Sequence, residues 1–209
     1  MIDVVIYGDS IMKGATPEGE NRYRSVMPRF LPRLAEKYGL AVTNKARFGS
    51  TIDRGYAQLQ KDLNEQAAPN RCALVEYGGN DCDFDWAAIA EAPAAEHLPR
   101  TSMAAFQDTL EAMADGLQKK DVKPLLMTLP PIHAERYLSF ICRGGLNRVN
   151  ILKWLGEAQM IYRFQEMYSS AVLKVALRRG LPLVDVRSYF LDKHNYAALI
   201  SEDGIHPSE

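Results

Sequence analysis

Short apolar segments alternate along the chain with longer stretches in which apolar residues recur at helical spacing. The short segments are rich in Val, Leu and Ile and do not alternate strictly between apolar and polar residues. Continuous apolar runs of this length are typical of strands buried on both faces, as in a parallel sheet. Five such strands are predicted, at residues 4–7, 41–44, 73–77, 124–128 and 182–186.

Helical patterns lie between the predicted strands, and capping residues mark several of their ends. Gly39 and Gly180 stand where the first and last patterns stop, and Thr101 or Ser102 precedes the third as an N-cap. Strands that alternate with helices predict an α/β fold, a three-layer α/β/α sandwich, here as one domain over residues 1–209. The predicted helices cover residues 30–38, 52–63, 103–117 and 158–179.

Two long connections, residues 82–100 and 132–155, interrupt this alternation. In a compact domain, such connections usually carry function or cover a site. Ligands of open parallel sheets bind beyond the carboxyl ends of the strands. We therefore expect the site where Gly, Asp, Ser and Asn residues follow the predicted strands, at positions 8–10, 47–49 and 78–81.

The composition argues against several classes of protein. The chain has 209 residues, a formal net charge of -1, and 47% hydrophobic and 24% charged residues. Nucleic-acid binding is not indicated, and no apolar stretch approaches the roughly 18 residues of a membrane span. The first residues show no secretory signal, and Cys72, Cys82 and Cys142 fit free thiols in a reducing compartment. We expect a cytoplasmic protein.

Ser10 is the first candidate for chemistry. It follows the first predicted strand, after Gly8 and Asp9, and glycine permits the tight turn that would present such a serine. A serine hydroxyl becomes a strong nucleophile when an adjacent base takes its proton. The competing interpretation is a helix cap, because Asp and Ser are favoured at that position.

The base must be one of four histidines. His206 stands three residues after Asp203, and Gly204 between them permits the carboxylate to turn back. The carboxylate can then accept the imidazole Nδ1–H and leave Nε2 free for the serine proton. The competing interpretation is a surface loop in which Asp203 caps the next segment. His133 is the rival base, but only Glu135 is near it.

Acyl transfer also needs donors for the oxyanion that develops on the carbonyl oxygen. Gly49 follows the second strand region, and Asn80 follows the third, where its side-chain NH₂ could reach a ligand. The N–H of Ser10 would complete the set. A turn glycine and an Asx-turn are the simpler interpretations of Gly49 and Asn80.

Together these segments resemble the SGNH (GDSL-type) hydrolase superfamily. Gly8-Asp9-Ser10 resembles its first block, Gly49 its second, Gly78-x-Asn80-Asp81 its third and Asp203-x-x-His206 its fifth. The resemblance implies a flavodoxin-like fold with a five-stranded parallel sheet and a Ser10-His206-Asp203 triad. It implies an oxyanion hole from Ser10, Gly49 and Asn80, and no metal or organic cofactor. Family activities include carboxylesterase, thioesterase, lysophospholipase and removal of acetyl groups from carbohydrates.

The sequence departs from the family pattern at two places. Ile11 stands where the family often has Leu, and Glu209 follows His206 by three residues where relatives continue into a glycine-containing turn and a closing helix. The sequence thus predicts that this helix is absent or truncated. Apolar surface would then be exposed, and His206 would be held less firmly.

Four further residues are candidates for contact with substrate. Asp9, Asp81, Trp86 and His133 all fall near the expected edge of the sheet. Plain packing is the simpler interpretation of Trp86, although an indole could stack on a sugar. The sequence predicts a serine esterase whose partner is a small polar ester, such as an acetylated carbohydrate. An acyltransferase with the same triad and a non-catalytic carbohydrate- or ligand-binding protein are the alternatives.

Overall fold

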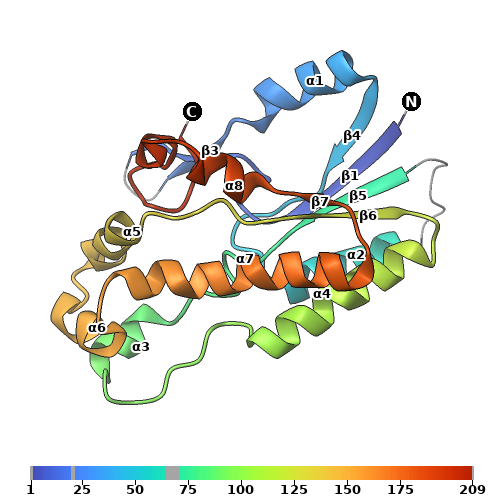
Figure 1. Ribbon diagram of the computed structural model, residues 1–209. Coiled ribbons are helices and arrows are strands. Elements are labelled where there is room, and N and C mark those ends of the chain that lie inside the picture. The colour runs from blue at the N-terminus through green and yellow to red at the C-terminus, as the bar shows by residue number, and fades with distance from the viewer. Residues whose placement is uncertain (1, 20–21, 65–70, 209) are drawn as a thin grey trace.

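The five predicted strands form one parallel sheet in the computed structural model, which describes residues 2–19, 22–64 and 71–208 (Figure 1). The strand order is β4-β1-β5-β6-β7, so the second of these strands along the chain lies outside the first. This is the flavodoxin-like order, and the predicted fold class is confirmed. The strands are β1 Ile2–Gly8, β4 Leu40–Asn44, β5 Arg71–Glu76, β6 Lys123–Met127 and β7 Leu183–Val184.

The last strand is shorter than the sequence predicts. Asp185 ends it, because its carboxylate accepts a hydrogen bond from the N–H of Ser188 at 3.1 Å and so caps helix α8 (Val186–Leu191). A side chain that competes for backbone N–H groups in this way favours a helix start over continued strand.

The four predicted helices are present with nearly the predicted bounds. Gly39 and Gly180 end the first and last of them in the left-handed conformation, with φ of 62° and 60°. Ser102 caps the third by accepting a hydrogen bond from the N–H of Ala105 at 3.3 Å. The helices are α1 Met27–Tyr38, α2 Ile52–Asp62, α4 Met103–Gln118 and α7 Gln159–Arg179.

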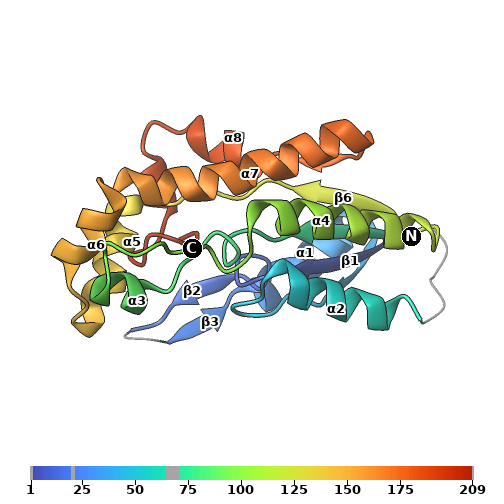
Figure 2. The ribbon, with the colours of Figure 1, turned by 90° about the horizontal axis from the view of Figure 1, so that it is seen from below.

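The two faces of the sheet are covered unequally. Helices α2, α4 and α7 lie together on one face, whereas α1 and α8 lie on the other (Figures 1 and 2). The first face carries the main apolar core, and most of its members are less than a few per cent exposed. Large members of this core include Ile52, Leu59, Phe106, Leu110, Met113, Leu126 and Tyr168.

The second face carries only a small cluster around Ile6 and Met127. Of the apolar residues that recur along α1, Leu31 packs against this cluster. Phe30, Leu34 and Tyr38 are 50%, 47% and 61% exposed. They remain in solvent because α1 contacts the sheet mainly at its edge strand β4.

The long connections fold into short helices at the carboxyl ends of the strands. Their apolar residues form a second core with the first half of α7, on the left in Figure 2. A hairpin of β2 (Ala15–Pro17) and β3 (Tyr23–Ser25), which the sequence did not predict, lies at the same end. The remaining elements are α3 Trp86–Glu91, α5 Ala134–Ile141, η1 Cys142–Gly144, α6 Arg148–Leu155 and η2 Tyr196–Leu199. None of the helices in the described ranges is long and apolar enough to span a membrane.

Candidate active site

Ser10 lies in a tight turn at the end of the interior strand β1. A side chain on Gly8 would meet Met12 at 2.8 Å and the Glu76 carbonyl oxygen at 3.1 Å, so only glycine fits there. The carboxylate of Asp9 accepts a hydrogen bond from the N–H of Ile11 at 2.8 Å and fixes the turn. Ser10 therefore follows a strand that is paired on both sides, with β4 and β5, and its turn is fixed.

His206 meets Ser10 from the far end of the chain. Its Nε2 lies 2.8 Å from the Ser10 Oγ, and its Nδ1 lies 2.6 Å from a carboxylate oxygen of Asp203. Because an ionised carboxylate can only accept, Nδ1 carries the hydrogen and Nε2 is left to accept from the serine hydroxyl. The structure thus brings the three residues into one hydrogen-bonded series.

The second oxygen of Asp203 is also fully engaged. It accepts hydrogen bonds from the N–H groups of Ile205 at 2.9 Å and His206 at 3.1 Å, and from the Ser201 hydroxyl at 2.9 Å. Burial alone would raise the pKa of Asp203, but the hydrogen bond and charge of His206, with these N–H groups, hold it below its usual range. Asp203 is therefore ionised beside the imidazole.

The loop that carries Asp203 and His206 is held against the start of α5. Gly204 has a φ of 79°, and a side chain there would meet the Tyr137 nitrogen at 2.4 Å. The His133 N–H donates to the Gly204 carbonyl at 2.8 Å, and the Arg136 guanidinium donates to the carbonyl of Ile200 at 2.6 Å. These contacts hold the imidazole in place from the side of α5.

The three candidate oxyanion donors lie in different settings. Among the described residues, the N–H groups of Ser10 and Gly49 donate no hydrogen bond, and Gly49 has a φ of 62° in an exposed turn. The Asn80 side-chain NH₂ donates to the Asp9 carboxylate at 2.9 Å and to the Ser50 carbonyl at 3.3 Å. Asn80 is thus oriented by Asp9, a contact that the spacing of the sequence could not reveal.

A small cavity of about 90 Å³ opens beside Ser10 and His206. The cavity is bounded mainly by apolar side chains of the second core, and Trp86 is one of its walls. The indole N–H of Trp86 and the hydroxyl of Tyr137 both donate to the Asp83 carboxylate, at 2.8 and 2.9 Å. The half-buried Asp83 therefore fixes these two aromatic walls. The residues around the cavity include Ile11, Phe84, Trp86, Ile132, Tyr137, Ile161, Phe164 and Ile205.

Asp81 and His133, which the sequence placed near substrate, are occupied elsewhere. The Asp81 carboxylate is fully buried and accepts from the Ile52 N–H at 3.0 Å and the Thr101 hydroxyl at 2.6 Å. The His133 Nδ1 accepts from the Arg136 N–H at 3.4 Å and caps α5. Neither borders the cavity, whereas Asp9 does.

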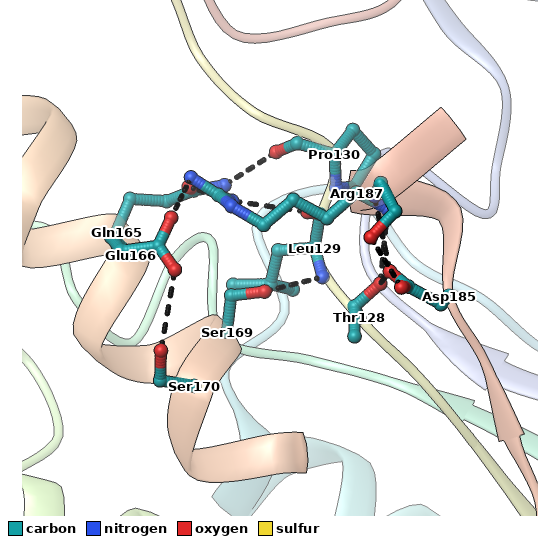
Figure 3. Close-up of polar contacts among 10 residues, drawn as sticks. Thr128, Leu129, Pro130, Gln165, Glu166, Ser169, Ser170, Asp185 and Arg187 are labelled. Carbon is teal, nitrogen blue, oxygen red and sulfur yellow. Dashed lines mark hydrogen bonds and ion pairs between the residues drawn. The ribbon is translucent and has the colours of Figure 1, made fainter. Parts of the chain in front are cut away.

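Sequence reasoning missed Gln165 as a wall residue. Its amide lies on the buried side of α7 and donates to the Pro130 carbonyl at 2.6 Å (Figure 3). Arg187, itself buried, donates to the Gln165 amide oxygen at 2.8 Å and to the Leu129 carbonyl at 3.1 Å, and pairs with Glu166 at 2.5 Å. Only three-dimensional contact reveals this set, because its members come from three separate segments.

No metal site accompanies these residues. Within residues 2–19, 22–64 and 71–208, no group of three or more His, Cys, Asp or Glu side chains is placed to hold a metal ion.

The fold and this site define an α/β protein with a flavodoxin-like parallel sheet, in which a serine, a histidine and an aspartate are in contact at the strand ends. Residues 6–209 match the GDSL-like Lipase/Acylhydrolase family. The chain belongs to this family of carboxylic ester hydrolases.

Individual relatives are more distant. An uncharacterized lipoprotein of Bacillus subtilis, YqeF, is 26% identical over 213 residues, which cover 99% of this chain and 81% of the relative. A lipase/acylhydrolase from Enterococcus faecalis has a similar structure, with a TM-score of 0.67, 21% identity and coverage of 100% and 88% of the two chains. A variant of an acetyl xylan esterase from Geobacillus stearothermophilus gives a TM-score of 0.65, 20% identity and coverage of 99% and 87%.

Replacement of Gly204 by alanine tests how the His206 loop is held. We expect Gly204→Ala to lower the free energy of unfolding by about 2–4 kcal/mol, because the new methyl group meets the backbone of α5 in a left-handed conformation. Gly180→Ala is the matched control, since Gly180 is also left-handed but has nothing within 4 Å of its added carbon. The control should lose only about 1 kcal/mol. Equal losses in urea unfolding would contradict a close contact at Gly204.

Proposed function

We propose that this protein is a serine esterase that transfers the acyl group of a small carboxylic ester to water. The observation that carries the proposal is the unbroken series of hydrogen bonds from Ser10 through His206 to Asp203. Both of its ends are held, one by the interior strand β1 and the other by three further donors to Asp203.

In the first step, His206 Nε2 takes the Ser10 proton as the serine oxygen bonds to the ester carbonyl carbon. His206 then gives that proton to the leaving alkoxide, and an acyl-serine remains. In the second step, water loses a proton to His206 as it attacks the acyl-serine. His206 then returns that proton to the Ser10 oxygen, which leaves as the hydroxyl while the acid is released. Asp203 keeps the imidazole in the correct tautomer and stabilises its charged form throughout.

The oxyanion of each tetrahedral intermediate needs donors that are free and already in place. The N–H groups of Ser10 and Gly49 satisfy no other acceptor among the described residues, which supports this role. Asn80 borders the cavity beside Ser10, and its NH₂ group is held by Asp9. Its weaker contact, at 3.3 Å to the Ser50 carbonyl, is the one that it would exchange for the oxyanion.

The cavity beside Ser10 supports a short acyl group. Its volume of about 90 Å³ is small beside the roughly 300–1,000 Å³ of sites for drug-sized ligands. A broad open groove adjoins it, and Trp86, Tyr137 and Ile205 border both spaces. The groove also has polar and charged side chains, Arg100 and Glu202 among them, which suit a polar alcohol. An acetylated carbohydrate has both features, and the similar fold of an acetyl xylan esterase agrees with this proposal.

Labelling with a fluorophosphonate probe tests the nucleophile directly. We expect the wild-type protein to be labelled at Ser10, as located by mass mapping, because the hydroxyl is activated by His206. Ser10→Ala should abolish both the labelling and ester hydrolysis while the thermal unfolding temperature stays within a few degrees. Labelling at another residue, or hydrolysis that survives in Ser10→Ala, would exclude Ser10 as the nucleophile.

Substitution of Asn80 tests the oxyanion assignment. We expect Asn80→Ala to lower kcat by about 10²–10³, with KM largely retained, because a donor that acts in the transition state is lost. Asn150→Ala is the control, since Asn150 also donates from a partly buried amide, to the Ala90 carbonyl at 2.7 Å, but lies away from Ser10. Its kcat should change by less than about threefold. A loss below about tenfold in Asn80→Ala would remove Asn80 from this role.

A series of esters of increasing acyl length tests the size of the cavity. We expect kcat/KM to be highest for acetyl and butyryl esters and to fall at least about tenfold for octanoyl esters, because the cavity has no room for the longer chain. Phe164→Ala, which enlarges the cavity, should move the optimum to longer chains. Met167→Ala on the exposed side of the same helix should not. A wild-type optimum at octanoyl esters would contradict the short-acyl proposal.

A further inference from the structure

Glu76 is a fully buried acid that the mechanism above does not use. It is the last residue of β5 and pairs with Gly8 of β1, two residues before Ser10. Its side chain is 0% exposed and borders the cavity, and neither carboxyl oxygen accepts a hydrogen bond of normal geometry from a donor in the described residues. An isolated ionised carboxylate would be costly in such a place, so the group must be neutral or share a proton.

The neighbour that can share a proton with Glu76 is Asp9. The two carboxyl groups interact directly, and both are buried. Asp9 uses both of its oxygens as acceptors, one for the Ile11 N–H at 2.8 Å and the other for the Asn80 NH₂ at 2.9 Å. Asp9 is therefore the acceptor of the pair, and the proton belongs to Glu76.

Two adjacent buried carboxylates cannot both ionise, which is the situation of paired acids in a shared site. Burial raises the pKa of Glu76 well above its usual range, and the negative charge of Asp9 raises it further. Burial also raises the pKa of Asp9, and this is the largest effect on it. The hydrogen bonds from the Ile11 N–H and the Asn80 amide, and the charge of His206, act in the opposite direction and lower that pKa in part.

We propose that Glu76 is a positioning residue for the active site: its carboxyl group holds the one proton shared with Asp9 and donates it there. Asp9 then remains an acceptor for Asn80 and for the turn that carries Ser10. The inference rests on the proposed function, because the donor held in this way is the oxyanion donor. No proton leaves the pair during turnover, so the reaction described above stays balanced.

Among the described residues, acidic and neutral groups surround the Asp9–Glu76 pair, together with one histidine. The charge of Asp81 raises the pKa of Glu76. The charges of both Glu76 and Asp9 raise the pKa of the Tyr77 hydroxyl, and the charge of Asp9 raises that of the Cys82 thiol. His206 is the one group acting on Asp9 that becomes cationic. An ionised Asp9 therefore also favours the imidazolium that forms when His206 takes the serine proton. Loss of the shared proton would add a second buried charge and push Asp9 and Glu76 apart.

The sign of the pH effect follows from the raised pKa of Glu76. A carboxyl group whose pKa is raised on folding contributes stability that is complete below its unfolded pKa and is lost as the pH rises through the folded pKa. Glu76→Gln keeps a donor toward Asp9 but cannot titrate. The thermal unfolding temperature of wild type should therefore fall relative to that of Glu76→Gln as the pH rises above the usual pKa range of a glutamate side chain.

The test compares Glu76→Ala, Glu76→Gln and the exposed control Glu135→Gln, which has only a surface ion pair with Arg148 at 3.2 Å. Ester kinetics, the rate of Ser10 labelling by fluorophosphonate and unfolding temperature are measured across pH. In Glu76→Ala we expect kcat and the labelling rate to fall at least about tenfold with KM within about threefold, because an oxyanion donor is misplaced. Glu76→Gln should restore kcat to within about threefold of wild type and extend it to higher pH.

Three results would overturn the inference. The first is a Glu76→Gln variant as slow as Glu76→Ala. The second is a plot of unfolding temperature against pH for Glu76→Gln that runs parallel to those of wild type and Glu135→Gln. This measurement decides the question even if Glu76→Ala fails to fold. The third is a wild type that Ser10 labelling shows to be unreactive, which would overturn the proposed function as well. Normal labelling with parallel profiles would overturn the role of Glu76 alone.

Discussion

The hydrogen bond between the Ser10 hydroxyl and the His206 imidazole joins residues 196 positions apart, and the rest of the structure is arranged around it. Ser10 needs little help, because β1 pairs on both sides, with β4 and β5, and its turn is fixed by Asp9. His206 has no strand of its own. Its place is set by Asp203 and by contacts with α5, which makes the loop the less secure partner in the bond.

Four buried acids, Asp9, Glu76, Asp81 and Asp203, lie in this part of the structure. A buried carboxyl group must be stabilised by partners or carry a proton, and the four differ in how this is achieved. Asp203 is stabilised as an anion by an imidazole and backbone N–H groups. Burial raises the pKa of Asp81 to about 6, although the hydrogen bonds from Thr101 and Ile52 partly offset this by lowering it. Asp9 and Glu76 interact with each other. Burial raises the pKa of Asp9, Glu76 and Asp81, so each of these acids depends on the neighbouring groups that stabilise or neutralise it.

The sequence predicts the fold well, because strands buried on both faces and capped helices leave local patterns. It also predicts Ser10, Asp203 and His206 as partners, since the spacing of Asp203 and His206 is local and the strand ends share one edge. It does not predict the contacts between distant segments. Nothing near Glu76 in the sequence reveals that Asp9 will face it, and the hairpin β2–β3 is too short for its pattern to show.

The wall of the cavity illustrates why such distant contacts matter for selectivity. Arg187 comes from α8, yet it orients the Gln165 amide on α7, because a guanidinium can only donate and must face the amide oxygen. The amide NH₂ is thereby directed to the Pro130 carbonyl, and α7 is joined to the segment after β6 (Figure 3). Burying a guanidinium is costly unless its hydrogen bonds and its charge are satisfied, and here Glu166 supplies the charge. A wall fixed by polar contacts cannot recede easily, so under the proposed function the size of the cavity, more than the apolar character of its lining, would limit the acyl group.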